Sequence, residues 1–220
     1  MKLRIAFFTV TLSLILCTSL MSADWGILMI DLGKKDISNG VLLLAGGDGF
    51  TEPDSIGGKD CRSVPKVPPG QDTGNHAYFI VDGTVVNDKS AESKLWIGVE
   101  YYDLADDGPT DILMDYDDIG DAYPNQAFAL TLPKDNRTIK FTKTEKWMIA
   151  IIAIDKAEFK EQGNGGDFRF HIEPYKSDIF YLDRVWVSNK ELKEDDLTGA
   201  KAVSPGGKLA VCWGELKREN

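Results

Sequence analysis

Apolar residues alternate with polar or small residues over short stretches of this chain, which is the periodicity of a β-strand. The alternation is clearest in 95–102 and again in 112–116. The stretch between them, DLADDGPTD, is rich in the Asp, Gly and Pro residues that close turns. We therefore expect 95–118 to form a β-hairpin, with Asp106 and Asp107 at its tip.

Further segments have the composition of strands and are separated by short connectors rich in Gly, Pro, Asp and Asn. Helical periodicity is scarce, and we expect short helical turns only around 155–162 and 188–197. The pattern predicts an all-β fold, a two-sheet antiparallel β-sandwich of the jelly-roll kind. The further strand candidates begin at Val41, Tyr78, Ala127, Lys146, Phe168, Tyr181 and Leu209.

The segment KWMIAIIAI, residues 146–154, is apolar at almost every position. A strand with this pattern is covered on both faces. We therefore expect a central strand, covered by the second sheet on one side and by loops or a neighbouring chain on the other. If one face were exposed, it would suit an interface with another protein.

The first 23 residues have the pattern of a secretory signal peptide. Lys2 and Arg4 precede an apolar run that is too short to span a bilayer comfortably. Cleavage after Ala23 would leave residues 24–220 as one domain. Since no second apolar run is long enough for a membrane span, we expect a soluble protein that is extracellular or periplasmic.

The chain is acidic, with 35 Asp and Glu residues, 25 Lys and Arg residues and a formal net charge of −10. This charge argues against nucleic acid as a partner. Two cysteines, Cys61 and Cys212, follow the signal peptide and would meet an oxidising compartment. A disulfide between them and two free thiols are both compatible with the sequence.

Outward side chains of the strand 95–102 suit a sugar ligand. If the alternate residues face the core, Trp96, Glu100 and Tyr102 point outward together and Gly98 leaves a gap between them. Aromatic rings lie against the C–H faces of sugars, and carboxylates bind sugar hydroxyls. The alternative is that the loop 46–75 covers Trp96 and Tyr102, which then fill a second small core.

A second group of candidates lies in FRFHIEPYK, residues 168–176. Alternation sends Arg169 and His171 outward, where Arg169 would bind an acidic sugar or pair with Glu100. Tyr175 follows the strand and, with Phe50 and Tyr123, is an alternative loop-borne binding aromatic.

Some jelly-roll polysaccharide lyases use a His, a Tyr and basic residues to move protons next to a uronate. His171, Tyr175 and Lys176 are residues of these types. Such lyases carry a glutamine two residues before the histidine, a position that Arg169 occupies here. Because residues of the required types are present, a lyase is a further alternative despite this difference.

Six segments in order resemble the galactose-binding-like jelly-roll modules, carbohydrate-binding-module-like β-sandwiches of secreted bacterial polysaccharide-degrading proteins. The likeness covers about residues 76 to 190 and includes no catalytic motif. It implies the sandwich fold and a non-catalytic, glycan-binding role. The segments are YFIVDG, LWIGVEYYD, DILMDYDD, KWMIAIIAI, AEFKEQGNGGDFRFHI and IFYLDRVWVS.

The resemblance also implies a structural calcium site. In calcium-containing modules of this architecture, an aspartate near the end of the last strands joins ligands from the N-terminal strand. Asp183 shares a face with Val185, which would turn its carboxylate inward. Ca²⁺ would then be held by Asp183 with Asp31 or Asp36. The alternative partner of Asp183 is a basic side chain or a loop hydrogen bond.

These observations lead to one leading hypothesis and two others. We predict a secreted, non-catalytic carbohydrate-binding protein with its ligand on surface aromatics and polar side chains. The second hypothesis is a structural or adhesion module that binds a protein partner or forms a homodimer, and the third is the lyase.

Overall fold

The computed structural model describes residues 25–45, 49–66, 76–86, 91–105, 108–116, 134–158, 165–172 and 178–198. The predicted signal peptide and the strands expected at 127 and 209 lie outside these residues. So do Asp106, Asp107, Tyr123, Tyr175 and Cys212.

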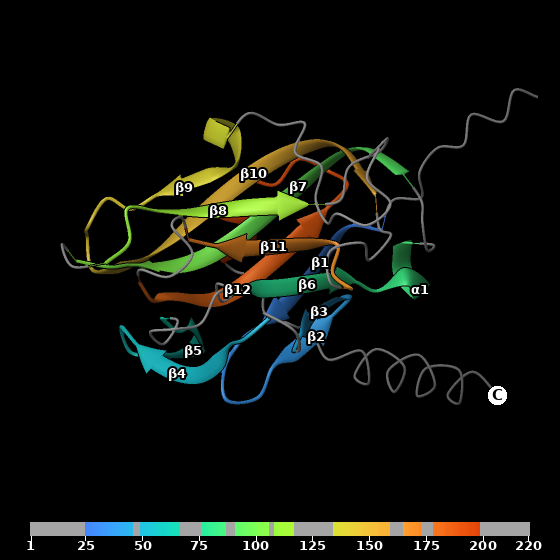
Figure 1. The fold of residues 1–220 in the computed structure, drawn as a ribbon. Helices are drawn as coiled ribbons and strands as arrows, with labels where there is room; N and C mark the ends of the chain where they lie inside the picture. The colour runs from blue at the N-terminus through green and yellow to red at the C-terminus, as the bar shows by residue number, and fades with distance from the viewer. Residues whose placement is uncertain are drawn as a thin grey trace, which may run out of the picture.

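The described residues form two antiparallel β-sheets that pack face to face (Figure 1). This confirms the predicted two-sheet antiparallel β-sandwich. Sheet A contains β1 (Ile27–Asp31), β2 (Ile37–Asn39), β4 (Glu52–Ile56), β5 (Lys59–Val64), β7 (Ala91–Asp103), β10 (Lys146–Glu158) and β12 (Phe180–Ser188). Sheet B contains β3 (Val41–Leu44), β6 (Ala77–Val81), β8 (Asp111–Tyr116), β9 (Thr138–Lys140) and β11 (Phe168–His171). The short helices are α1 (Gly83–Val86), η1 (Lys134–Arg137) and α2 (Glu194–Thr198).

The order of strands decides which side chains become neighbours. Sheet A runs β10-β7-β12-β1-β2, and the β4–β5 hairpin joins it where β5 pairs with β12. Sheet B runs β3-β6-β11-β8-β9. Figure 1 shows β8, β11 and β6 lying across the strands of sheet A. No helix in the described part of the chain has the length and apolar character needed to cross a membrane.

The main core lies between the sheets and is built by the alternation seen in the sequence. Leu95, Ile97 and Val99 of β7 are buried in it, as are Phe79 and Phe168 of sheet B, whose rings stack with centroids 5.2 Å apart. Burial of each large apolar side chain stabilises the fold by about 1.5–3 kcal/mol. The intervening residues of β7 therefore face outward, away from sheet B.

The hairpin predicted for 95–118 is wrong. β7 belongs to sheet A and β8 to sheet B, so the chain crosses from one sheet to the other between them. β7 pairs instead with β10 and β12, and β8 with β9 and β11. Turn-forming residues between two alternating strands serve a hairpin and a link between sheets equally well, so local sequence does not separate the two.

The apolar strand β10 is also placed differently from the prediction. It is at the edge of sheet A in the described order, not at its centre. Ile152 and Ile154 enter the main core, while Ile149 and Ile151 pack on the opposite face. Its apolar character therefore comes from contacts on both faces and not from strands on both sides.

The two helical turns predicted from the sequence are only partly confirmed. β10 continues as a strand to Glu158, so the turn expected around 155–162 does not begin at its first residues. The expected turn at 188–197 is present as α2, but only from Glu194 to Thr198. β1 and the β4–β5 hairpin had no prediction, because their short segments lack a clear alternation.

A second small core lies on the outer face of sheet A. Met29, Trp186, Leu192 and Leu197 form it, with Trp96 half-buried against it. A Cβ at Gly98 would stand 3.0 Å from Leu197 Cδ1 and 3.2 Å from Trp186 Cε3. The gap expected at Gly98 is therefore filled, and Trp96 packs against this second core, which includes Leu192 and Leu197.

Candidate functional site

The turn of the β4–β5 hairpin lies against the outer face of sheet A. Gly57 and Gly58 form this turn with φ values of 57° and 79°, which favour glycine. A Cβ at Gly57 would collide with the Tyr102 ring and stand 2.9 Å from Trp147 Nε1. Lys59 follows the turn directly, so the hairpin brings a cation over β7 and β12.

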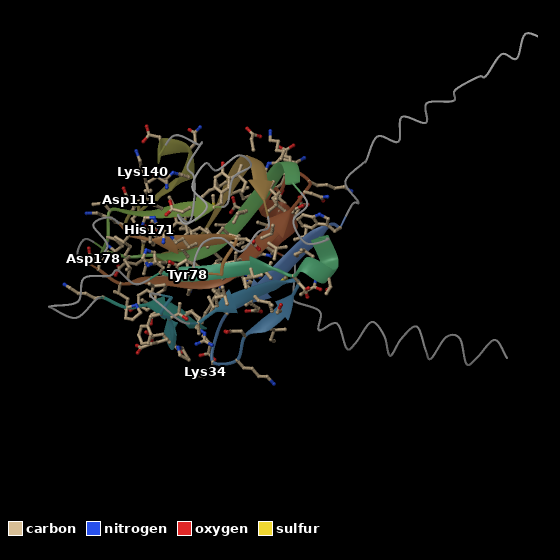
Figure 2. All side chains as sticks on the ribbon, turned by 45° about the vertical axis from the view of Figure 1, so that its right-hand side comes forward. Lys34, Tyr78, Asp111, Lys140, His171 and Asp178 are labelled. Carbon is tan, nitrogen blue, oxygen red and sulfur yellow. The ribbon has the colours of Figure 1, made fainter. Side chains whose placement is uncertain are left out.

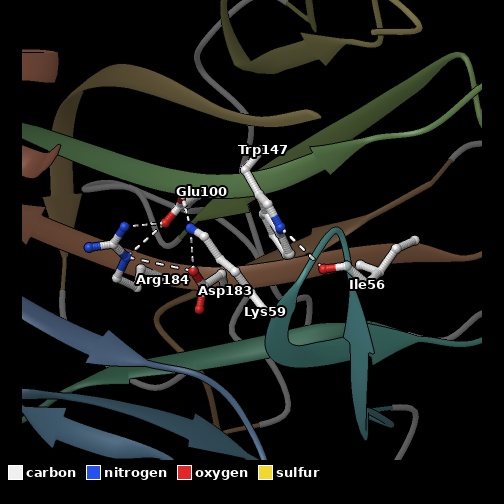
Figure 3. Close-up of polar contacts among 6 residues, drawn as sticks. All are labelled: Ile56, Lys59, Glu100, Trp147, Asp183 and Arg184. Atoms are coloured by element: carbon white, nitrogen blue, oxygen red, sulfur yellow. Dashed lines mark hydrogen bonds and ion pairs between the residues drawn. The ribbon is translucent and has the colours of Figure 1, made fainter. Parts of the chain in front are cut away.

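Lys59 contacts two carboxylates from different strands. Its Nζ lies 2.5 Å from Glu100 Oε1 on β7 and 2.9 Å from Asp183 Oδ2 on β12. Arg184 completes the cluster, since its Nε donates to Glu100 Oε2 at 2.7 Å and its Nη2 lies 2.6 Å from the same oxygen. Figure 3 shows these four side chains converging from three strands.

A β-bulge explains why Asp183 faces this cluster and not the core. Leu182 and Val185 are both buried in the main core, although regular alternation cannot place residues three apart on one face. The pairing of β12 with β7 shifts between Leu182 and Arg184, which absorbs the extra residue. The predicted inward orientation of Asp183 is therefore wrong.

The two carboxyl groups of the cluster have opposite pKa shifts. The pKa of Asp183 is raised to about 6, mainly by burial; the neighbouring Glu100 acts in the same direction, while Lys59 opposes the shift. Burial acts on Glu100 in the same direction, but Lys59 and Arg184 outweigh it and the pKa of Glu100 is lowered. Glu100 therefore stays ionised to lower pH than Asp183.

Two aromatic rings lie beside the charged cluster. Tyr102 and Trp147 pack edge to face with ring centroids 5.5 Å apart, and both are half-buried. Trp147 Nε1 donates to the Ile56 carbonyl at 3.3 Å, and the Tyr102 hydroxyl donates to the Glu145 carbonyl at 2.9 Å. Lys59 Nζ lies 5.0 Å from the centroid of the Trp147 ring, which adds a cation–π contact.

The ligand-binding residues predicted from the sequence lie on the outer faces of two different sheets, A and B. Trp96, Glu100 and Tyr102 share the outer face of sheet A, as alternation predicts. Arg169 and His171 lie on sheet B, where both contact Asp115, so the suggested pairing of Arg169 with Glu100 is wrong.

Sequence reasoning gave no binding role to Lys59, and it assigned Trp147 to packing. Lys59 carries no local signal, because its partners are far away in the chain. The ring of Trp147 could have been noticed from its position opposite Tyr102 only after the pairing of β10 with β7 was known. Phe50, a loop-borne alternative, is 48% exposed.

The three aspartates of the expected calcium site are separated into different contacts. Asp183 contacts Lys59, and Asp36 accepts from Arg62 Nε at 3.0 Å and Nη2 at 2.8 Å. Burial raises the pKa of Asp31, although the charge of Arg184 opposes this. Within the described ranges no group of three or more His, Cys, Asp or Glu side chains could hold a metal ion. The calcium site stays a prediction.

No protein-family model matches the chain, and the search of curated proteins finds no similar sequence. Similar solved structures include botulinum neurotoxin type C, whose cell entry depends on interaction with two ganglioside molecules (14% identity, TM-score 0.43). This likeness covers 77% of the present chain and 49% of the toxin chain, so the present chain spans about half the length of that relative.

A family 29 carbohydrate binding module is also similar, at 11% identity and a TM-score of 0.41, over 77% of the present chain and 99% of the module. An isomaltodextranase of Arthrobacter globiformis T6 in complex with panose has 10% identity and a TM-score of 0.38 over 74% of the present chain and 23% of its own. At these identities and TM-scores the likenesses assign no ligand to the present chain.

Proposed function

We propose that this chain is a secreted, non-catalytic carbohydrate-binding protein whose sugar binds on the outer face of sheet A. The observation that carries the proposal is the position of half-buried Trp147 and Tyr102 beside the cluster of Lys59, Glu100 and Arg184. The Trp147 and Tyr102 rings supply an apolar surface for a sugar, and the charged cluster supplies directional hydrogen-bonding groups next to them.

The rigidity of the cluster supports this function. Glu100 is held by Lys59 on one oxygen and by Arg184 on the other, so its carboxylate is already oriented before a ligand arrives. A pre-oriented group loses less conformational entropy on binding. Lys59 remains accessible, with 35% of its side chain exposed, and can turn a donor toward a hydroxyl.

The charge of the cluster favours a neutral sugar at this site. Lys59 and Arg184 balance Glu100 and Asp183, so the four groups add no net charge to the face when all are ionised. Hydroxyl groups match such a mixture of donors and acceptors. A carboxylate or sulfate group would meet Glu100 as a like charge.

The two carboxyl groups do not resemble a glycosidase pair. Asp183 and Glu100 share Lys59, whose Nζ lies 2.9 Å from Asp183 Oδ2 and 2.5 Å from Glu100 Oε1 and so occupies the space between them. Glycosidase carboxylates stand about 5 Å or more apart, because the scissile bond lies between them. This contact supports binding without hydrolysis.

A glycan array of residues 24–220 tests the proposal, with the variants Trp147→Ala, Trp96→Ala and Phe50→Ala and with exposed Ile37→Ala as the matched control. We expect Trp147→Ala to weaken binding roughly tenfold or more, since an aromatic contact of about 1.4 kcal/mol corresponds to a factor of ten. Ile37→Ala should bind like the wild type. Loss of binding only in Phe50→Ala would move the site to the loop.

The same array carries two further comparisons. Loss of binding with a chelator alone would support a calcium ion held by Asp183 with Asp31 or Asp36. If the protein binds no glycan on the array, the proposal is rejected and an adhesion module with a protein partner is favoured. Secretion is tested separately by N-terminal sequencing of the exported protein, which should begin after Ala23.

A further inference from the structure

Strand β10 is a long strand at the edge of sheet A. In the described order of strands it pairs with β7 on one side and ends the sheet on the other (Figure 1). It has 13 residues, and its stretch 147–154 contains no charged residue. The edge of a sheet presents backbone N–H and C=O groups that a further strand can pair with. A long apolar edge is therefore a template for pairing with another chain.

The other edge strands of the described residues carry protection against such pairing. β2 and β9 have 3 residues each, and β3 has 4. β4 has 5, but Pro53 lacks an N–H group, and Glu52 and Asp54 add charge. Short length, proline and charged residues are the usual means of preventing contact between edges. The stretch 147–154 of β10 has neither proline nor charge, which indicates that its edge forms a contact.

The side chains of β10 are incompletely covered along this edge. All residues of 147–151 are half-buried, including Met148 and Ala150, which pack against the main core. On the neighbouring strand β7, Ile97 and Val99 face the same core and are 2% and 0% exposed. β7 has a strand on both sides. A further strand beside β10 would bury its apolar side chains in the same way, and this burial would favour association.

The charge of β10 permits a second copy of the chain as its partner. The chain has a formal net charge of −10, so two copies repel each other over most of their surface. The sequence of β10, KWMIAIIAIDKAE, contains two lysines and two acidic residues and therefore sums to zero. Two copies meet least repulsion where a neutral, apolar edge faces its own equivalent.

The two ends of β10 are complementary in charge. When the whole of β10 pairs antiparallel with the whole of a second β10, Ile152 is opposite itself and Lys146 is opposite Glu158 at both ends. A shift by two residues also keeps each side chain on its face. In one direction that shift puts Lys146 opposite Lys156, and in the other it puts Lys146 beyond the end of the partner strand. Charge therefore favours full-length pairing.

We propose that two copies of this chain form a symmetric dimer by antiparallel pairing of their β10 edges. The two A sheets then form one continuous sheet, and the two-fold symmetry closes the assembly at two copies. The Asp155 carbonyl accepts a hydrogen bond from the Tyr116 hydroxyl at 3.3 Å. A carbonyl oxygen has two lone pairs, so this contact leaves room for a bond from the partner strand.

The dimer presents two copies of the outer face of sheet A on the same side. Directly paired residues share a face, so pairing across the two-fold axis keeps both outer faces together. Trp147 is five residues from Ile152 at the axis, so the two Trp147 side chains lie about 34 Å apart at roughly 3.4 Å per residue. Two sites on one face bind a polymeric glycan with avidity. This consequence rests on the function proposed above, whereas the dimer does not.

Sedimentation equilibrium of residues 24–220 tests the dimer. We expect twice the mass of one chain, and the mass of one chain at high dilution. Ala153 is exposed and is opposite Ile151 in the full-length pairing, so the lysines of Ala153→Lys would be diagonal neighbours across the interface. This variant should raise the dissociation constant of the dimer by roughly tenfold or more. Leu42→Lys adds the same charge at a 44% exposed position of edge strand β3 and should leave the mass unchanged.

An exchange of charges tests the register. Lys146→Glu should weaken the dimer roughly tenfold, because like charges then face each other at both ends. The double variant Lys146→Glu with Glu158→Lys should associate like the wild type. Lys140→Glu is the matched control, because Lys140, labelled near Asp111 in Figure 2, is an exposed lysine on edge strand β9 of sheet B. It should not change the mass, and circular dichroism verifies that each variant is folded.

Two results would overturn the inference. The first is a wild-type protein that sediments as one chain at every concentration. The second is a dimer of full strength in folded Ala153→Lys and Lys146→Glu proteins, which would place the interface elsewhere. Glycan binding is a separate result. A single chain that binds glycan keeps the proposed function and rejects the dimer, and a dimer that binds no glycan does the reverse.

Discussion

Gly57 packs directly against the ring of Tyr102, and no side chain can stand between them. Gly57 belongs to the turn of the β4–β5 hairpin and Tyr102 to β7, so this contact fixes the hairpin over sheet A. The hairpin turn also lies against Trp147, because a Cβ at Gly57 would stand 2.9 Å from Trp147 Nε1, and the Trp147 ring packs edge to face with Tyr102.

Substitution of Gly57 by alanine should lift the hairpin tip away from the sheet. The new Cβ would collide with Tyr102 at a positive φ, so we expect a loss of stability of roughly 2–3 kcal/mol. Trp147 should become more exposed, which shifts its fluorescence to longer wavelength.

Gly58→Ala is the matched control for Gly57→Ala. Gly58 also has a positive φ, but a Cβ there has nothing within 4 Å. It should therefore show only the backbone effect, about 1 kcal/mol. Equal losses in urea unfolding of the two variants would contradict the packing of Gly57 against Tyr102.

Replacement of Lys59 by methionine should destabilise the protein more at pH 8 than at pH 5. The folded pKa of Asp183, about 6, lies above the unfolded value of 3.8. Its stabilising contribution is therefore fully present below pH 3.8 and is lost as the pH rises through 6. Without Lys59, the ionised carboxylates at pH 8 lack their shared cation, and we expect a loss of roughly 2–3 kcal/mol.

Urea unfolding at the two pH values measures this difference. Lys34→Met is the control, because Lys34 pairs with Asp60 while 72% of its side chain is exposed. Such a pair contributes at most about 1 kcal/mol. A loss in Lys59→Met that does not change between pH 5 and pH 8 would argue against the buried pair of Asp183 and Glu100.

Asp103 should hold the connection between β9 and β10 in place. Its carboxylate accepts hydrogen bonds from the backbone of Thr142, Lys143 and Thr144 and from the hydroxyls of both threonines. Burial opposes ionisation, but these hydrogen bonds lower the pKa of Asp103 to about 2. Asp103→Asn should lower stability by about 2 kcal/mol at pH 7, since an amide cannot accept all of these bonds.

The pH dependence of Asp103 has the opposite sign to that of Asp183. Because its folded pKa lies below the unfolded 3.8, its contribution is present above pH 3.8 and is lost as the pH falls toward 2. The difference between wild type and Asp103→Asn should therefore shrink from pH 7 to pH 3. Exposed Asp135→Asn should change stability little at either pH, and a constant difference for Asp103→Asn would refute the assignment.

Cys61 should be unreactive in the folded protein. Its thiol is buried and free, and burial raises its pKa to about 11, so little thiolate forms at neutral pH. In a Cys212→Ser protein, a disulfide reagent should label Cys61 only when denaturant is added. Rapid labelling without denaturant would show that β5 opens readily.

Part of the outer face of sheet A follows from β7 alone. Period-two alternation placed Trp96, Glu100 and Tyr102 together, because side-chain direction in a strand without a bulge depends only on position along that strand. Glu100 and Asp115, on either side of the predicted turn, each became the centre of a charged cluster. Alternation could not show that these clusters lie on opposite sheets, since that depends on how the chain crosses the sandwich.

Alternation and turn residues are local properties, so they define the strands and the face that each side chain takes, and with them the class of fold. The pairing partners follow only from the folded chain: β7 and β8 join different sheets, a bulge turns Asp183 outward, and Lys59 reaches Glu100. Strand pairing and ion pairing between distant residues depend on the packing of the whole core, and no short segment of the sequence contains that information.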